Sequence, residues 1–159
     1  MVKSGKLHAL QTQYELEEQN ALEEMNRVAI VVAERRGVVE SLVSKRVELE
    51  EELGRLRGSQ RQKALQSGNS SQLASIARFE KLVVEKLSVV ENNLVEKEAE
   101  LKRALDREES AEKNLVLARI ERRKVEKVIE NRQRSARVID AAREEAMTDE
   151  MNFYLNKNK

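Results

Sequence analysis

The sequence predicts an all-α protein: a long two-helix antiparallel coiled coil with an overhanging C-terminal helix. Three observations predict it. The 159 residues contain no proline and five glycines, 37% are charged while 3% are aromatic, and aliphatic residues recur in steps of three and four. A globular domain of this length usually has prolines in its loops and about a quarter of its residues charged. A 3.5-residue aliphatic period without loop residues is typical of a coiled coil.

The first helix is expected over about residues 5–57. Its aliphatic stripe runs in register from Met25 to Leu56. Four apolar residues upstream join this register only through a shifted step, which predicts a stutter in the supercoil. They are Leu7, Leu10, Tyr14 and Ala21.

A connection is expected over residues 58–70, because glycine, serine and asparagine gather there and interrupt the register. Ser59 followed by Gln62 has the spacing of a capping box, so the connection can hold a short helix that stops near Gly68. The residues that follow offer N-caps for the next helix. They are Asn69, Ser70 and Ser71.

The second helix is expected over about residues 71–154, where one heptad register continues from Leu73 to Phe153 for about eleven repeats. Two long helices with so short a connection should fold back antiparallel into a single hairpin over residues 1–159. The second helix is longer, so roughly its last 35 residues should overhang as a single helix.

Charge is unevenly distributed. The total is +1, which does not favour nucleic acid or an anionic membrane as a partner. Residues 119–137 nevertheless carry eight basic and three acidic residues, a net charge of +5. This stretch is either a solvated helix face or a basic surface that docks on an acidic protein.

Nothing in the sequence predicts catalysis, so we expect no enzyme, no catalytic residue, no cofactor and no metal site. His8 is the only histidine, and without cysteine there is neither a disulfide nor a thiolate zinc site. Consecutive acids such as Glu50 and Glu51 fan out around a helix and cannot converge on one metal ion. No uncharged stretch approaches the roughly 20 residues that cross a membrane, and the start of the chain lacks a secretion signal, so a soluble protein without membrane insertion is expected.

Three stretches give the chain a resemblance to a known family: SGNSSQLASIARFEKLVVEKLSVVENNL at 67–94, RIERRKVEKVIENR at 119–132 and REEAMTDEMNFYL at 143–155. With the helical layout above, the whole chain resembles the FliJ/YscO family, the small stalk proteins of type III export systems in flagella and injectisomes. The resemblance fits the flagellar system and the injectisome alike.

The resemblance implies a cytoplasmic, non-enzymatic protein, peripheral to the inner-membrane export apparatus. Family members are similar in shape to the coiled-coil part of the rotary-ATPase gamma subunit. The implied partners are the hexameric export ATPase and its regulator, the export gate membrane protein and export chaperones, with a monomer expected for the chain alone. The residues expected to dock on the ATPase are Arg119, Arg122, Arg123, Lys124 and Lys127. Phe79 and Val83 are candidates for a gate-facing surface, although Val83 also lies in the seam.

Two alternatives remain open at this point. One is a generic coiled-coil scaffold in which the overhanging helices of several copies associate. The other is a nucleic-acid-binding arm like the helical hairpin of seryl-tRNA synthetases, which the scarcity of aromatic residues for base stacking disfavours.

Overall fold

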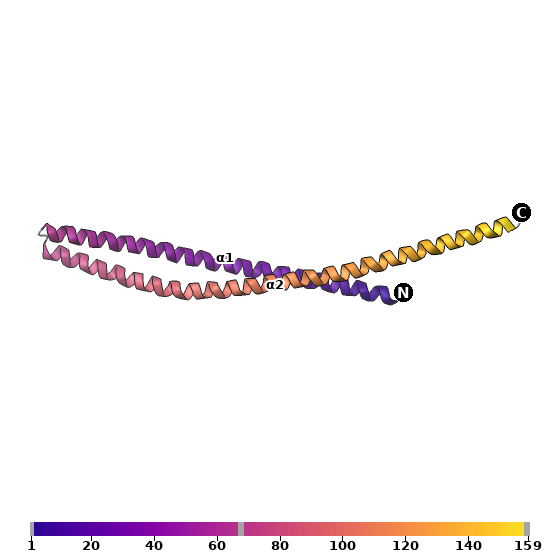
Figure 1. Cartoon of the computed structure of the whole chain (residues 1–159). Helices are drawn as coiled ribbons and strands as arrows, with labels where there is room; N and C mark the ends of the chain where they lie inside the picture. Colours follow the sequence, from indigo (N-terminus) through magenta and orange to yellow (C-terminus); the bar gives the residue numbers. More distant parts are fainter. Residues whose placement is uncertain (1, 67–68, 158–159) are drawn as a thin grey trace. The chain divides into compact units, whose positions relative to one another are not determined.

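The structure, a computed structural model, describes residues 2–66 and 69–157, with side chains over 5–66 and 69–153. Helix α1 spans Val2–Leu65 and helix α2 spans Ser70–Lys157, and the two long helices pack against each other (Figure 1). No strand occurs among the described residues. The predicted all-α class is therefore confirmed.

The first helix is longer than predicted. It passes through Gly58 and ends at Leu65 instead of at about residue 57, so the stretch after Ser59 is not a separate short helix. Gln60 and Lys63 are half-buried, which shows that the three-and-four spacing of the packed face continues through this stretch. A helix-interior glycine costs about 1 kcal/mol, less than nucleating a new helix would cost. Gly68, the predicted end of the short helix, lies outside the described residues.

Asn69 caps the second helix, as its residue type suggested. The backbone amides of Gln72 and Leu73 donate to the Asn69 carbonyl at 3.0 and 3.3 Å. The Ser71 amide donates to the Asn69 side-chain oxygen Oδ1 at 3.3 Å. The bonds from Ser71 and Gln72 satisfy amides of the first turn that lack an i to i−4 partner, and the bond from Leu73 is the first regular helical one, so α2 begins at Ser70.

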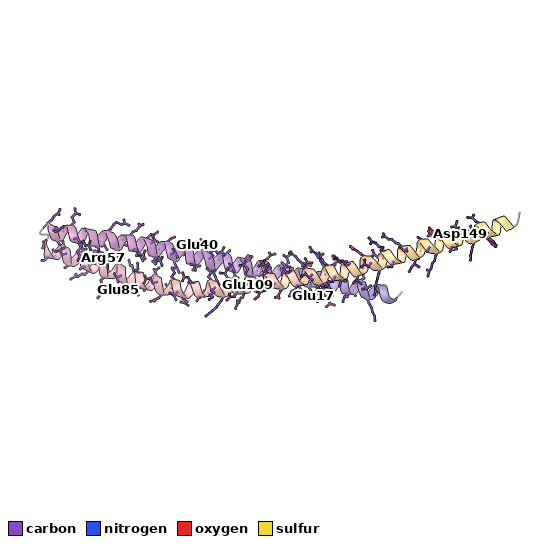
Figure 2. All side chains as sticks on the ribbon, in the orientation of Figure 1. Glu17, Glu40, Arg57, Glu85, Glu109 and Asp149 are labelled. Atoms are coloured by element: carbon purple, nitrogen blue, oxygen red, sulfur yellow. The ribbon has the colours of Figure 1, made fainter. Side chains whose placement is uncertain are left out.

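The chain divides into two compact units, each containing part of both helices. One is Met25–Ala111, which we call the turn unit, and the other combines Met1–Glu24 with Glu112–Lys159, which we call the terminal unit. Figure 2 shows charged side chains along both helices, including Glu40 and Glu85 in the turn unit and Glu17 and Asp149 in the terminal unit. All four of these are exposed.

The core of the turn unit is aliphatic. Leu49, Val83 and Val90 are buried there, and four leucines pack against them: Leu42, Leu53, Leu56 and Leu87. Every one of these residues lies in the predicted stripe. Apolar burial of this kind is the main stabilising contribution to a helix pair.

Two cross-helix ion pairs define how the helices run in the turn unit. Arg57, near the end of α1, lies 2.8 Å from Glu80, near the start of α2. Arg35, earlier in α1, pairs with Glu100, later in α2. Because positions on α1 fall as positions on α2 rise, the helices of this unit are antiparallel.

The predicted stutter is wrong. In the terminal unit the half-buried positions of α1 are Leu7, Gln11, Tyr14, Glu18 and Ala21, an unbroken alternation of steps of four and three. The next step of four leads to Met25, so the spacing on α1 needs no shift. Leu10, which had suggested the shift, is 38% exposed. The prediction failed because it followed apolar residues only, whereas two polar residues hold positions on this packed face.

The packed face of α2 ends earlier than the heptad register does. Leu115 is 7% exposed and Val125 and Ile129 are half-buried, but every side chain from 130 to 153 is exposed. The heptad register itself continues to Phe153, which is 64% exposed, in a stretch that was expected to have no partner helix. Spacing alone marks a face that can pack, and burial additionally needs a second helix to cover it.

Candidate protein-docking surface

The basic stretch at residues 119–137 lies on α2 in the terminal unit. Two of the predicted docking residues, Arg119 and Arg122, pair there with one carboxylate of α1. Nε of Arg119 donates to Oε1 of Glu18 at 3.2 Å, and Nε of Arg122 lies 2.6 Å from Oε2 of Glu18. The Glu18 side chain is only 19% exposed. These two arginines thus already hold α1 against α2.

Sequence reasoning did not single out Glu18. The available signal was its position, because the steps of three and four that connect Tyr14 to Ala21 pass through it. An acidic residue on a packed helix face needs a cationic partner to offset its loss of hydration. The basic stretch supplies that partner.

The other three predicted docking residues are more accessible. Lys124 lies 2.6 Å from Glu121 on the same helix, with 63% of its side chain exposed. Arg123 and Lys127 are exposed, and within residues 2–66 and 69–157 no ion pair engages either of them. An exposed pair on one helix contributes little and is readily exchanged. These three cations can therefore meet an external acid without disturbing the contact between α1 and α2.

Two further arginines extend this accessible set. Arg134 and Arg137 are exposed, and with Lys127 they border a shallow hollow of about 460 Å³. Together with Arg123 they follow one another at intervals of four, seven and three residues, which places all four on one face of the helix. We call Arg123, Lys127, Arg134 and Arg137 the basic ridge. Sequence reasoning counted Arg134 and Arg137 in the net charge but not among the docking residues, although their spacing was readable.

Phe79 and Val83 do not form one surface. Val83 is 4% exposed and belongs to the core of the turn unit, whereas Phe79 is 58% exposed. The two residues are one helical turn apart, but only Val83 falls on the packed face. A gate-facing surface in this region would therefore depend on Phe79 and not on Val83.

A polar cluster interrupts the packed face of the turn unit. Glu100 accepts a hydrogen bond from Nζ of Lys97 at 2.8 Å and also pairs with Arg35. The hydrogen bond from Lys97 is the largest influence on the pKa of Glu100 and, with the positive charges of Lys97 and Arg35, holds it below its ordinary value, although partial burial acts in the opposite direction. Val31 and Val38 flank the cluster. Its chemistry is that of a structural ion pair, since one carboxylate is matched to two cations.

No group of histidine, cysteine or acidic residues suited to a metal ion occurs in the described part of the chain. His8 is exposed.

Among the described residues, neither helix contains an apolar stretch able to cross a membrane.

Comparison with protein-family models, curated proteins and solved structures finds no significant match to this chain.

Proposed function

We propose that this chain is a non-enzymatic stalk component of a type III protein export ATPase complex, which links and stimulates the ATPase ring and contacts the export gate and chaperones. The proposal starts from the resemblance of the sequence to the FliJ/YscO family. It includes a cytoplasmic location at the inner-membrane export apparatus. The observation that carries it furthest is the basic ridge, four exposed arginine and lysine side chains that no ion pair engages within the described residues, against one acid, Glu130, that shares their helix face.

The proposed architecture is an antiparallel coiled-coil hairpin in which α2 continues beyond α1 as a single overhanging helix. The exposure of all side chains from 130 to 153 supports the overhang, and the antiparallel ion pairs of the turn unit support the hairpin. A narrow helical element of this kind fits the bore of a ring-shaped ATPase. The ridge lies where the overhang begins, so a ring subunit with acidic side chains could meet it directly.

The docking proposal concerns Arg123 and Lys127 first, because Arg119 and Arg122 also hold Glu18. Reversing the charge of Arg119 would therefore weaken the helix pair together with any docking. The double variant Arg123→Glu/Lys127→Glu avoids that ambiguity. We expect it to lower capture of the cognate export ATPase, and stimulation of its hydrolysis, at least tenfold, because two attractive contacts become repulsive.

The matched control is Lys102→Glu/Arg103→Glu, which reverses the same two charge types on exposed side chains of α2 in the turn unit. It should bind and stimulate like the unmodified chain. Equal ATPase binding and stimulation by both double variants would remove the ridge from the docking surface. Failure of the unmodified chain to bind any export ATPase would remove the stalk function itself.

Two other functions make different predictions. A generic scaffold would show no affinity for the ATPase. A nucleic-acid-binding arm would bind RNA with an affinity that falls steeply as salt rises.

Contact with the export gate, for which Phe79 is the accessible candidate, is tested by Phe79→Ala in a gate-binding assay, since this side chain is 58% exposed.

A further inference from the structure

The end of α2 has a packing face that nothing described in the chain covers. The heptad positions from Arg132 to Glu150 are all exposed and include Ala136, Ile139 and Ala146. In proteins most helical stability comes from packing an apolar face against another element, and here that face is uncovered. We call these heptad positions, with Arg143 among them, the terminal stripe.

The charges around the terminal stripe fall into two blocks of opposite sign. Residues 131–137 hold three arginines and no acid, and residues 144–150 hold four acids and no base. Between the blocks, Arg143 and Asp140 balance each other, with Nη1 4.0 Å from Oδ1. No ion pair engages Arg132 or Glu150 within the described residues. On the stripe itself the charges are Arg132 at one end, Arg143 near the middle and Glu150 at the other end, because the remaining charges of the two blocks lie at other heptad positions.

The stripes of two copies have complementary charges when the two helices run antiparallel, but not when they run parallel in the same register. If a second copy lies antiparallel, with the centre of the pairing near residue 141, the positive end of each stripe at Arg132 meets the negative end of the other at Glu150. In the same register the stripe positions match one by one, as the heptad pattern requires. Arg132 meets Glu150 of the second copy, Ala136 meets Ala146, and Ile139 meets Arg143. In a parallel pair with matching residue numbers, Arg132 would face Arg132 and Glu150 would face Glu150, and both contacts would repel.

We propose that the terminal stripe is a self-association surface, and that its occupant is the terminal stripe of a second copy of this chain, packed antiparallel. This proposal replaces the monomer that the resemblance implies. The stripe spans 132–150, and its alanine and isoleucine layers are small, so the dimer is weak and depends on concentration and salt. It does not depend on the stalk function, because the basic ridge occupies different heptad positions from the stripe.

Sedimentation equilibrium of the full chain, from about 1 µM to about 1 mM, tests the dimer. The unmodified chain should pass from monomer to dimer, and added salt should shift the transition to higher concentration. Arg132→Glu brings glutamates together at the two end layers, and Glu150→Arg brings arginines together, so each should weaken dimerisation at least tenfold. The charge-swapped chain carrying both changes restores the pairs and should dimerise again. Lys102→Glu, in the turn unit, should change nothing.

Disulfide trapping tests the register. The chain has no cysteine, so introduced pairs report without interference. The double variant Ala136→Cys/Ala146→Cys should form a covalent dimer on mild oxidation. Ala136→Cys alone should not, because in the proposed dimer its two copies lie ten residues apart along the helix axis, about 15 Å. A monomer throughout the concentration range would overturn the proposal. Cross-linking by Ala136→Cys alone, as efficient as that of the double variant, would overturn the antiparallel arrangement.

Discussion

Truncation of Val83 to alanine separates a core role from a surface role at this position. Val83 is 4% exposed, whereas its sequence neighbour Val84 is 42% exposed. Val83→Ala removes two buried methyl groups, which costs about 1.6 kcal/mol at about 0.8 kcal/mol per group. The space left behind adds to this loss, and the higher helix propensity of alanine offsets about 0.5 kcal/mol of it. We expect the free energy of unfolding to fall by about 1.5 kcal/mol.

Val84→Ala is the matched control, since it makes the same chemical change one residue away on the exposed side. Its transfer loss is roughly halved and largely cancelled by helix propensity, so the change should stay below about 0.5 kcal/mol. Urea unfolding followed by far-ultraviolet circular dichroism measures both values. Equal losses in the two variants, or a larger loss for Val84→Ala, would refute the assignment of Val83 to the core.

Three further predictions concern single positions. Gly37→Ala should raise the free energy of unfolding by about 0.5–1 kcal/mol in the same urea assay, because an added Cβ meets no atom within 4 Å. Glu100 has its pKa lowered in the folded chain, so the stability that it contributes is present above the unfolded pKa, about 4.3, and is lost as pH falls through the lower folded value. The variant Glu100→Gln should therefore lose less stability on acidification than the exposed control Glu98→Gln, when the free energy of unfolding is measured against pH. Glu18→Gln should lower thermal stability by about 1 kcal/mol while Glu17→Gln does not, since Glu18 alone of these two joins Arg119 and Arg122; equal losses would contradict the pairing.

The sequence predicted the fold where apolar residues report packing directly. Every position of the aliphatic stripe between Met25 and Leu56 and of the register from Leu73 to Ile129 is buried or half-buried. Periodicity works here because the same spacing that brings side chains onto one helix face determines which of them a second helix can cover.

The remaining features depend on contacts that spacing does not encode. Gln11 and Glu18 lie on the packed face although they are polar, and Glu18 does so because arginines from the other helix meet it. Gly58 looked like an end of helix but is accommodated within α1. Among the candidate docking residues, net charge singles out the stretch at 119–137, but only the ion pairs separate Arg119 from the accessible Arg123.

The cross-helix ion pairs differ in how much chain lies between their members, which orders their formation in time. The separations are 23 residues for Arg57 and Glu80, 65 for Arg35 and Glu100, and 101 for Glu18 and Arg119. Closing a longer loop costs more entropy, and each pair that forms shortens the loop left for the next. We therefore expect pairing to nucleate beside Asn69 and to zip toward the N-terminus of α1. Native-state amide hydrogen exchange should show weaker protection around Glu18 than around Leu49, and equal protection would contradict this order. The contact of Glu18 with Arg119 and Arg122 is thus expected to be the last to form and the first to open.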